Sequence, residues 1–231
     1  MRQLILLRHG QSQWNQENRF TGWSNVPLTE LGIQEAHQAG QIIKRSDLTI
    51  SLIYSSVLER CVETSKIILE ELQDPKIQLI TTWELNERSY GALEGLSKEQ
   101  IATKYGEGTV NDWRRSYELR PPQLDTKDPR NPANNSQYKD VPKELLPTGE
   151  SLEDTEVRIR KFWARVVLPE IAKKNNVLVI SHGNSLRVFS KILENLSIES
   201  LAKLEIPTGQ PILYSFDENL DLVGPPEYLK Y

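Results

Sequence analysis

The chain has 231 residues, of which 38% are hydrophobic and 26% are charged, and its formal net charge is −4. This balance fits one soluble domain with a full core and argues against nucleic acid as the main partner. No apolar run approaches the roughly 18 residues of a membrane span, and a lone Cys61 excludes an internal disulfide. The N-terminus enters a strand pattern without any signal-peptide pattern. We therefore expect a cytoplasmic protein, with residues 1–231 as a single domain.

Strand and helix patterns alternate along the chain. The sequence predicts, in order, a strand at 3–7, a helix at about 29–44, a strand at 52–54, a helix at about 58–72, a strand at 77–80, helices at about 97–105 and 109–119, a helix from 151 to about 174, a strand at 177–181, a helix at 185–195 and a strand at 212–216. This alternation predicts a three-layer α/β fold, in which a mostly parallel central sheet has helices on both faces.

Two segments lie outside this alternation. Residues 120–149 are rich in proline and asparagine, and we expect them to form a long surface loop. Residues 218–231 form a short C-terminal tail. Both segments are treated as parts of the single predicted domain.

Two of the three histidines stand in nearly the same setting. Arg8-His9-Gly10-Gln11-Ser12 follows the apolar run 4–7, and Ser181-His182-Gly183-Asn184-Ser185 follows the apolar run 177–180. Ligands of parallel sheets bind beyond the carboxyl ends of the strands. If the two strands are neighbours, both imidazoles face one pocket, and each following helix offers free N–H groups to an anion. The alternative is a pair of structural histidines at strand ends.

Several arginines accompany these histidines: Arg8, Arg60, Arg88 and the Arg114-Arg115 doublet. Planar guanidinium groups bind phosphate oxygens in pairs, so the set suits a small, multiply anionic ligand. A neutral imidazole is a competent nucleophile toward phosphorus. Glu87 is the best candidate for exchanging a proton with the accepting oxygen, although an ion-pair role is equally compatible with the sequence.

Longer stretches resemble the cofactor-dependent phosphoglycerate mutases of the histidine phosphatase superfamily. The resemblance covers residues 2 to about 217, through the stretches 8–15 (RHGQSQWN), 18–23 (NRFTGW), 85–98 (LNERSYGALEGLSK), 113–117 (WRRSY) with Pro121-Pro122, 182–187 (HGNSLR) and 206–209 (IPTG). The Arg-His-Gly motif alone specifies only the superfamily, whereas the combination specifies the mutase branch.

The resemblance implies that the chain interconverts 3-phosphoglycerate and 2-phosphoglycerate in glycolysis and gluconeogenesis, with 2,3-bisphosphoglycerate as primer and without a metal. His9 would carry the phosphoryl group, and Glu87 would exchange protons with the substrate hydroxyl. His182, Arg8 and Arg60 would stabilise the transferring group. The substrate would be bound by Arg8, Ser12, Asn15, Thr21, Gly22, Arg60, Glu87, Arg88, Tyr90, Lys98, Arg114, Arg115, Gly183 and Asn184.

Some positions depart from the family pattern. Gln11 stands where many members have Glu, Ser89 replaces a common His, and the segment 120–149 differs near Tyr138 and Gly149. The alternatives are a histidine phosphatase that hydrolyses small phosphate esters and an inactive binding module on the same fold. Lys98 and the arginine doublet favour the mutase over the phosphatase. The presence of both histidines and Glu87 argues against the inactive module.

Members of this family are commonly dimers or tetramers, so the resemblance also implies a homodimer or homotetramer. In this family a flexible C-terminal segment often closes over the site. Only Lys230 in the tail could bring a charge to a ligand.

Overall fold

The computed structural model describes residues 2–46 and 48–230. The described residues do not include Met1 and Tyr231, the two ends of the predicted domain and its tail, or Asp47. The strands of the described chain form one sheet in the order β3-β2-β4-β1-β5-β6. Their bounds are β1 Arg2–Arg8, β2 Leu52–Ser56, β3 Gln78–Thr82, β4 Val177–Ser181, β5 Ile212–Phe216 and β6 Glu227–Tyr228. β1 to β4 pair in parallel, whereas β5 and β6 are antiparallel to their neighbours.

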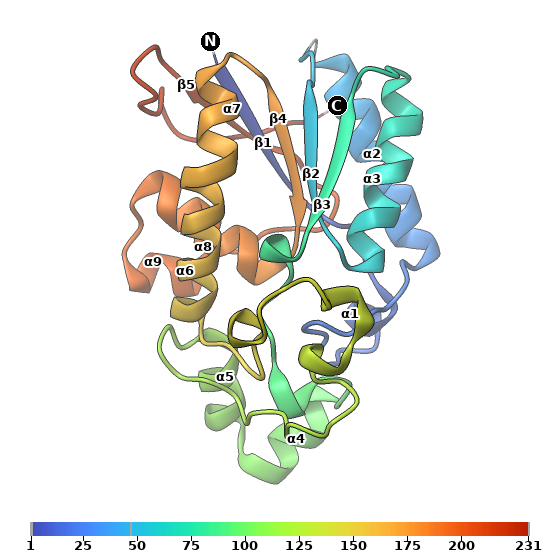
Figure 1. The fold of residues 1–231 in the computed structure, drawn as a ribbon, viewed down its shortest axis with the longest axis vertical. Coiled ribbons are helices and arrows are strands. Elements are labelled where there is room, and N and C mark those ends of the chain that lie inside the picture. Colours follow the sequence, from blue (N-terminus) through green and yellow to red (C-terminus); the bar gives the residue numbers. More distant parts are fainter. Residues whose placement is uncertain (1, 47, 231) are drawn as a thin grey trace.

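The strands are apolar on both faces because helices cover both faces. Leu4 and Leu6 of β1 pack on one side, and Ile5 and Leu7 pack on the other. The helices α2 (Glu30–Arg45) and α3 (Glu59–Leu72) cover the second side. The first side is covered by α6 (Leu152–Phe162), α7 (Leu168–Ala172) and α8 (Gly183–Glu194), so the molecule has three layers (Figure 1). The predicted fold class is confirmed.

Two predicted helices differ from the structure. The helix expected at 109–119 is α5, Glu107–Arg115, and it ends earlier because the chain turns toward α6, where the Tyr117 hydroxyl donates to Glu156 at 3.0 Å. The helix expected from 151 to 174 is interrupted by a π-helical turn at Trp163–Val167. Pro169 follows at the start of α7 and has no N–H for the regular helical hydrogen bond, which accounts for the interruption.

Short elements that the sequence analysis did not predict connect the layers. They are α1 (Gln13–Gln16), α9 (Ile198–Lys203) and 3₁₀ turns at Trp83–Leu85 and Gly91–Leu93. The helices α4 (Lys98–Tyr105) and α5 lie beyond the carboxyl ends of β1 and β2 (Figure 1). The site described below lies between these helices and the sheet.

The segment 120–149 contains 3₁₀ turns at Pro132–Asn134, Ser136–Tyr138 and Lys143–Leu145. Much of it is exposed, but Tyr138 and Leu146 are buried against Trp23. These contacts attach the segment to the chain that follows β1.

The C-terminal tail lies along the sheet. β6 pairs with β5, and Leu229 is buried with Ile5 and Leu7. No helix in the described chain is long and apolar enough to cross a membrane.

Candidate active site

The two His-Gly motifs meet because β1 and β4 are parallel neighbours. Arg8 is paired with Ser181 in the sheet, and the His9 N–H donates to the Ser181 carbonyl at 3.0 Å. The residue that follows each strand is a histidine, so both histidines lie where the carboxyl ends of β1 and β4 meet. The centroids of the His9 and His182 rings are 4.9 Å apart. The two strands are neighbours and the two rings lie close together as expected, but only His9 lines the cavity described below, because His182 is buried behind Arg60.

Gly10 lets the chain turn sharply after His9. A Cβ at this position would lie 2.1 Å from the carbonyl oxygen of Gly32, at the start of α2. Only glycine allows this approach of two backbones.

His9 is held as a neutral imidazole. Its Nδ1 lies 2.6 Å from the Gly10 carbonyl oxygen, which can only accept, so Nδ1 carries the proton and Nε2 keeps its lone pair. Burial, together with the positive charges of Arg60 and Arg8, lowers the pKa of His9 well below its usual value. The ring is consequently neutral at pH 7.

Arg60 lies between the two histidines. It comes from the first turn of α3, is buried, and its Nε is 3.2 Å from both His9 Nε2 and His182 Nδ1. Its terminal nitrogens donate to the carbonyls of Ser24 and Gly22, each at 2.9 Å. These four acceptors thus fix the orientation of the guanidinium group before any ligand binds.

His182 lies behind Arg60 and is fully buried. Since Nδ1 accepts from Arg60, the neutral ring carries its proton on Nε2, which is 3.4 Å from Cys61 Sγ. Burial and the charge of Arg60 lower the pKa of His182. Burial also raises the pKa of the Cys61 thiol. Cys61 is distant from any histidine in sequence, and the fold brings it into contact with one.

Arg8 points from the end of β1 into the site. Its Nη1 donates to the Ile206 carbonyl at 2.8 Å, whereas its buried Nε has no hydrogen-bond partner within the described structure. An unpaired buried guanidinium N–H is costly unless an anion accepts from it. This donor indicates an anionic ligand.

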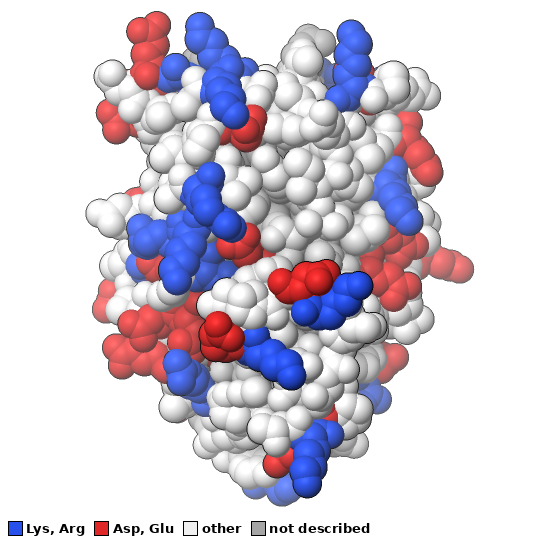
Figure 2. Space-filling model, viewed as in Figure 1, with Lys and Arg blue, Asp and Glu red and all other residues white. Residues whose placement is uncertain are grey.

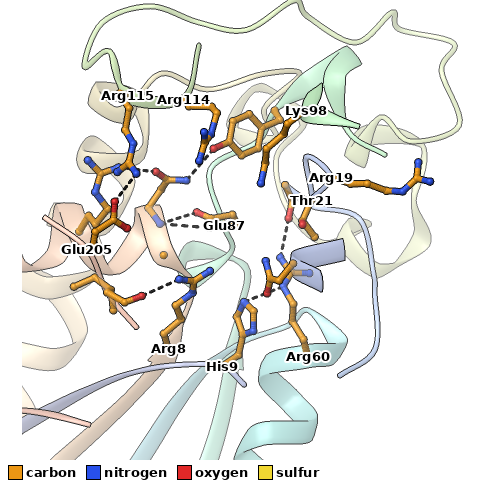
Figure 3. A pocket seen from close by; sticks show the side chains of 17 residues that line it. Arg8, His9, Arg19, Thr21, Arg60, Glu87, Lys98, Arg114, Arg115 and Glu205 are labelled. Carbon is orange, nitrogen blue, oxygen red and sulfur yellow. Dashed lines mark hydrogen bonds and ion pairs between the residues drawn. The ribbon is translucent and has the colours of Figure 1, made fainter. Parts of the chain in front are cut away.

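The N-terminus of α8 holds the Glu87 carboxylate. The Asn184 N–H, in the first turn of that helix, lies 3.2 and 3.3 Å from the two Glu87 carboxylate oxygens, and the Arg88 N–H donates to one of them at 2.7 Å. Free N–H groups at a helix start favour a negative charge. The carboxylate is therefore oriented by backbone donors while it faces the cavity (Figure 3).

Of these groups, Arg8, His9, Arg60, Glu87 and Asn184 line one cavity of about 120 Å³. Figure 3 shows Arg8, His9 and Arg60 at one end and Lys98, Arg114 and Arg115 at the other. The cationic side chains that line it are Arg8, Arg19, Arg60, Lys98, Arg114, Arg115 and Arg187, against the carboxylates Glu87 and Glu205. Such an excess of donors suits a small ligand with several negative charges.

The predicted site residues divide into two groups. Those that line the cavity are Arg8, His9, Asn15, Thr21, Gly22, Arg60, Glu87, Tyr90, Lys98, Arg114, Arg115, Gly183 and Asn184. Ser12, Arg88 and His182 are buried behind it. The Ser12 hydroxyl caps α1 and bonds Asn15, and the Arg88 guanidinium stacks 4.5 Å from the centre of the Tyr90 ring.

Four lining residues were missed by the sequence analysis: Arg19, Arg187, Glu205 and Ile206. Arg19 and Arg187 lie inside the quoted motifs, directly after Asn18 and Leu186, so their positions carried a signal. Ile206 is the first residue of the quoted stretch 206–209, whereas Glu205 lies just before it in the loop after α9 and only the fold brings it to the cavity. Among the described residues, no three histidine, cysteine or acidic side chains gather as metal ligands.

Comparisons with known proteins show the family of this chain. The chain matches the histidine phosphatase superfamily (branch 1) over residues 4–131 and 122–220. It is 44% identical to the 2,3-bisphosphoglycerate-dependent phosphoglycerate mutase of Parabacteroides distasonis, over 100% of this chain and 95% of that protein. It is 46% identical to the protein of the same name from Borrelia garinii subsp. bavariensis, over 96% of this chain and 89% of that protein.

Solved structures agree on the fold. A putative α-ribazole-5'-P phosphatase from Escherichia coli superposes with a TM-score of 0.74 at 21% identity, covering 100% of this chain and 96% of that one. A mycobacterial glucosyl-3-phosphoglycerate phosphatase gives a TM-score of 0.71 at 24% identity, covering 93% of each chain. At these identities the likeness concerns the arrangement of the sheet and helices alone.

Proposed function

Because this chain belongs to the histidine phosphatase superfamily and, within it, to the 2,3-bisphosphoglycerate-dependent phosphoglycerate mutases, we propose that it interconverts 3-phosphoglycerate and 2-phosphoglycerate through a phosphohistidine at His9. The observation that carries the proposal is a neutral, buried imidazole at one end of a cavity lined mainly by cations. A glycolytic and gluconeogenic role in the cytoplasm follows from this reaction, and a homodimer or homotetramer remains our expectation for its assembly.

His9 acts as the nucleophile in this scheme. Its Nε2 lone pair attacks phosphorus, and the proton stays on Nδ1, which donates it to the Gly10 carbonyl, so no base is needed to activate the ring. In the structure Arg60 Nε donates to Nε2 at 3.2 Å, a contact that the phosphorus atom replaces, and the Arg8 Nε–H has no partner among the described residues. As negative charge spreads over the equatorial oxygens, these prealigned cations, with His182 behind them, stabilise the transferring group.

Glu87 exchanges the proton of the substrate hydroxyl. Its carboxylate faces the cavity, and backbone N–H groups orient it at the same time. When a substrate oxygen attacks the phosphohistidine, the carboxylate accepts the hydroxyl proton, and in the reverse step it returns the proton to the leaving oxygen.

The far end of the cavity binds the part of the substrate that does not react. Lys98, Arg114 and Arg115 supply positive charge there. The Asn184 side-chain amide lines the cavity as well, and its hydrogen bond to the Tyr90 hydroxyl at 3.3 Å fixes its orientation. Asn15, Thr21, Gly22 and Gly183 also line the cavity and complete the proposed binding set, whereas Ser12 and Arg88 act from behind it through Asn15 and Tyr90. Two sets of cations at opposite ends fit a ligand that is anionic at both ends.

The donor set also fits 2,3-bisphosphoglycerate. The unpaired Arg8 Nε and the cations at both ends would hold its two phosphates and its carboxylate. When bound, this compound supplies the phosphoryl group that first charges His9.

The proposal is tested with purified protein and 3-phosphoglycerate, with and without trace 2,3-bisphosphoglycerate, while 2-phosphoglycerate and free phosphate are measured together. We expect primer-dependent isomerisation with little phosphate release. His37→Ala is the matched control for His9→Ala, because His37 lies on α2 outside the cavity and bonds Glu71. Release of phosphate without isomerisation would favour the phosphatase alternative instead.

A further inference from the structure

The proposed chemistry uses only one of the two carboxylates in the cavity. Glu205 lies in the loop after α9 and lines the cavity together with Ile206, whose carbonyl holds Arg8. Its Oε1 is 2.5 Å from Arg115 Nη2 (Figure 3). A carboxylate thus occupies one of the cations that the proposed function assigns to the substrate.

The ion pair is not needed to hold this loop in place. The Gly209 N–H donates to the Arg8 carbonyl at 3.0 Å, Arg187 donates to the Leu201 carbonyl, and Leu204 donates back to Ser200. The Glu205 side chain is 68% exposed, and exposed ion pairs contribute little to stability. Loss of the Glu205 charge is therefore expected to change the free energy of unfolding little.

The charge of Glu205 also opposes anions in the cavity. It acts on Arg8 and Arg187 as well as on Arg115: burial lowers the pKa of Arg8 and of Arg187, and the negative charge of Glu205 offsets part of that lowering in each. In the free enzyme this negative charge already offsets part of the positive charge of the arginines. It therefore weakens their attraction for an incoming phosphate or carboxylate.

We propose that Glu205 is a competing counter-ion for Arg115: an anionic substrate that reaches Arg115 must displace the Glu205 carboxylate, so residue 205 sets substrate affinity without taking part in phosphoryl transfer. The weakness of an exposed pair makes this displacement feasible for a dianionic phosphate. The identity of the substrate rests on the proposed function, whereas the competition for Arg115 does not.

The test is Glu205→Gln, which keeps the size of the side chain and removes its charge. We expect the Kd for 3-phosphoglycerate, measured by calorimetry on unphosphorylated protein, to fall about two- to five-fold, the size expected for one exposed ion pair. KM should fall in the same direction. In an Arg115→Met background the same substitution should change Kd much less, because the competition acts mainly through Arg115.

The matched control is Glu218→Gln. Glu218 follows Phe216, which pairs with Arg2 at the start of β1, so this substitution removes one negative charge at the end of the strands away from the cavity and should leave Kd unchanged. An unchanged Kd in Glu205→Gln would overturn the proposal. A larger Kd would also overturn it, because Glu205 would then be orienting Arg115 to bind the substrate.

Inorganic phosphate serves as a second probe that does not depend on the mutase assignment. If the protein fails to isomerise 3-phosphoglycerate but Glu205→Gln still binds phosphate more tightly, the counter-ion role stands and the proposed function falls. If isomerisation is observed and neither ligand binds more tightly to the variant, the counter-ion role falls alone.

Discussion

Neutrality of the His9 imidazole is a consequence of its neighbours. Two arginines and complete burial disfavour the charged ring, and the Gly10 carbonyl selects the tautomer. The ring that acts as nucleophile in the proposed scheme is therefore unprotonated at Nε2 without a partner base. The same arginines that keep it neutral are placed to receive charge when the phosphoryl group arrives.

Glu87→Gln separates the two chemical roles in the site. The amide keeps the shape of the side chain but cannot accept the hydroxyl proton, so we expect kcat for isomerisation to fall by about 10²–10⁴-fold. Phosphorylation of His9 by a donor with a good leaving group needs no such proton and should change little. Rates of both steps, followed by rapid quench, check this; an equal loss in the two would make Glu87 an orienting residue.

Glu94 provides a prediction about stability and pH. It is buried and accepts from Ser24 Oγ at 3.0 Å and from the Tyr90 N–H at 3.1 Å, yet burial still raises the pKa of its carboxyl to about 6. The folded state therefore binds this proton more tightly than the unfolded state, whose pKa is the ordinary 4.5. Stability falls as pH rises through this window, and the ionised group costs about 2 kcal/mol at pH 7.

Removal of that charge by Glu94→Gln is expected to raise the free energy of unfolding at pH 7 by about 1–2 kcal/mol. The gain should shrink toward zero near pH 4.5, where wild-type Glu94 is itself protonated. Urea unfolding at several pH values measures the difference between the two proteins. A difference that does not vary with pH would contradict the assignment of the charge penalty to Glu94.

At the scale of elements, α6 attaches the long segment 120–149 to the site. Arg158, on α6, is buried and binds the Glu150 carboxylate at 3.0 and 3.1 Å. The same guanidinium group donates to the carbonyls of Glu84 and Asn86 at 2.6 and 3.0 Å. One side chain thus connects the end of the segment to the turn that carries Glu87.

Arg158→Met should destabilise the fold by about 3–5 kcal/mol, because it leaves the buried Glu150 carboxylate without its partner. Arg160→Met is the matched control: Arg160 is 56% exposed, pairs with Glu156 one turn away, and should change stability by less than about 1 kcal/mol. Chemical denaturation compares the two. Equal losses of stability in the two variants would show that burial of the Arg158–Glu150 pair does not increase its contribution to stability.

Elements with a regular pattern could be predicted from the sequence, and their interruptions could not. The strand at 212–216 and the helix after Thr29 have the predicted positions because apolar spacing and capping residues are local signals. The π-helical turn near Pro169 and the early end of α5 depend on contacts with other elements. Residues such as Glu205 enter the cavity through a loop whose path no local pattern encodes.

At the scale of the whole molecule, the net charge of −4 hides a strongly positive cavity. On the face shown in Figure 2, basic and acidic side chains are interspersed. The concentration of positive charge lies instead inside the cavity, where the β1 and β4 ends meet α4 and α5. The sequence indicated cations near the histidines, and the topology shows which of these scattered arginines line one cavity.

This charge separation predicts a salt dependence. Raising the ionic strength from about 0.05 M to 0.3 M shortens the range of the attraction between the cavity and an anionic substrate, so KM should rise several-fold. Sucrose at matched osmolarity should leave KM unchanged. Steady-state kinetics measures both, and a KM independent of salt would count against the cationic cavity as the substrate site.

The most direct test of the account is to locate the phosphoryl group after brief exposure to 2,3-bisphosphoglycerate at neutral pH, by mass spectrometry of the intact chain and of its peptides. The account predicts one acid-labile phosphate per chain, on His9, absent from His9→Ala and retained in His37→Ala. Phosphate on His182 or His37, or no phosphohistidine in a protein that still isomerises 3-phosphoglycerate, would contradict it.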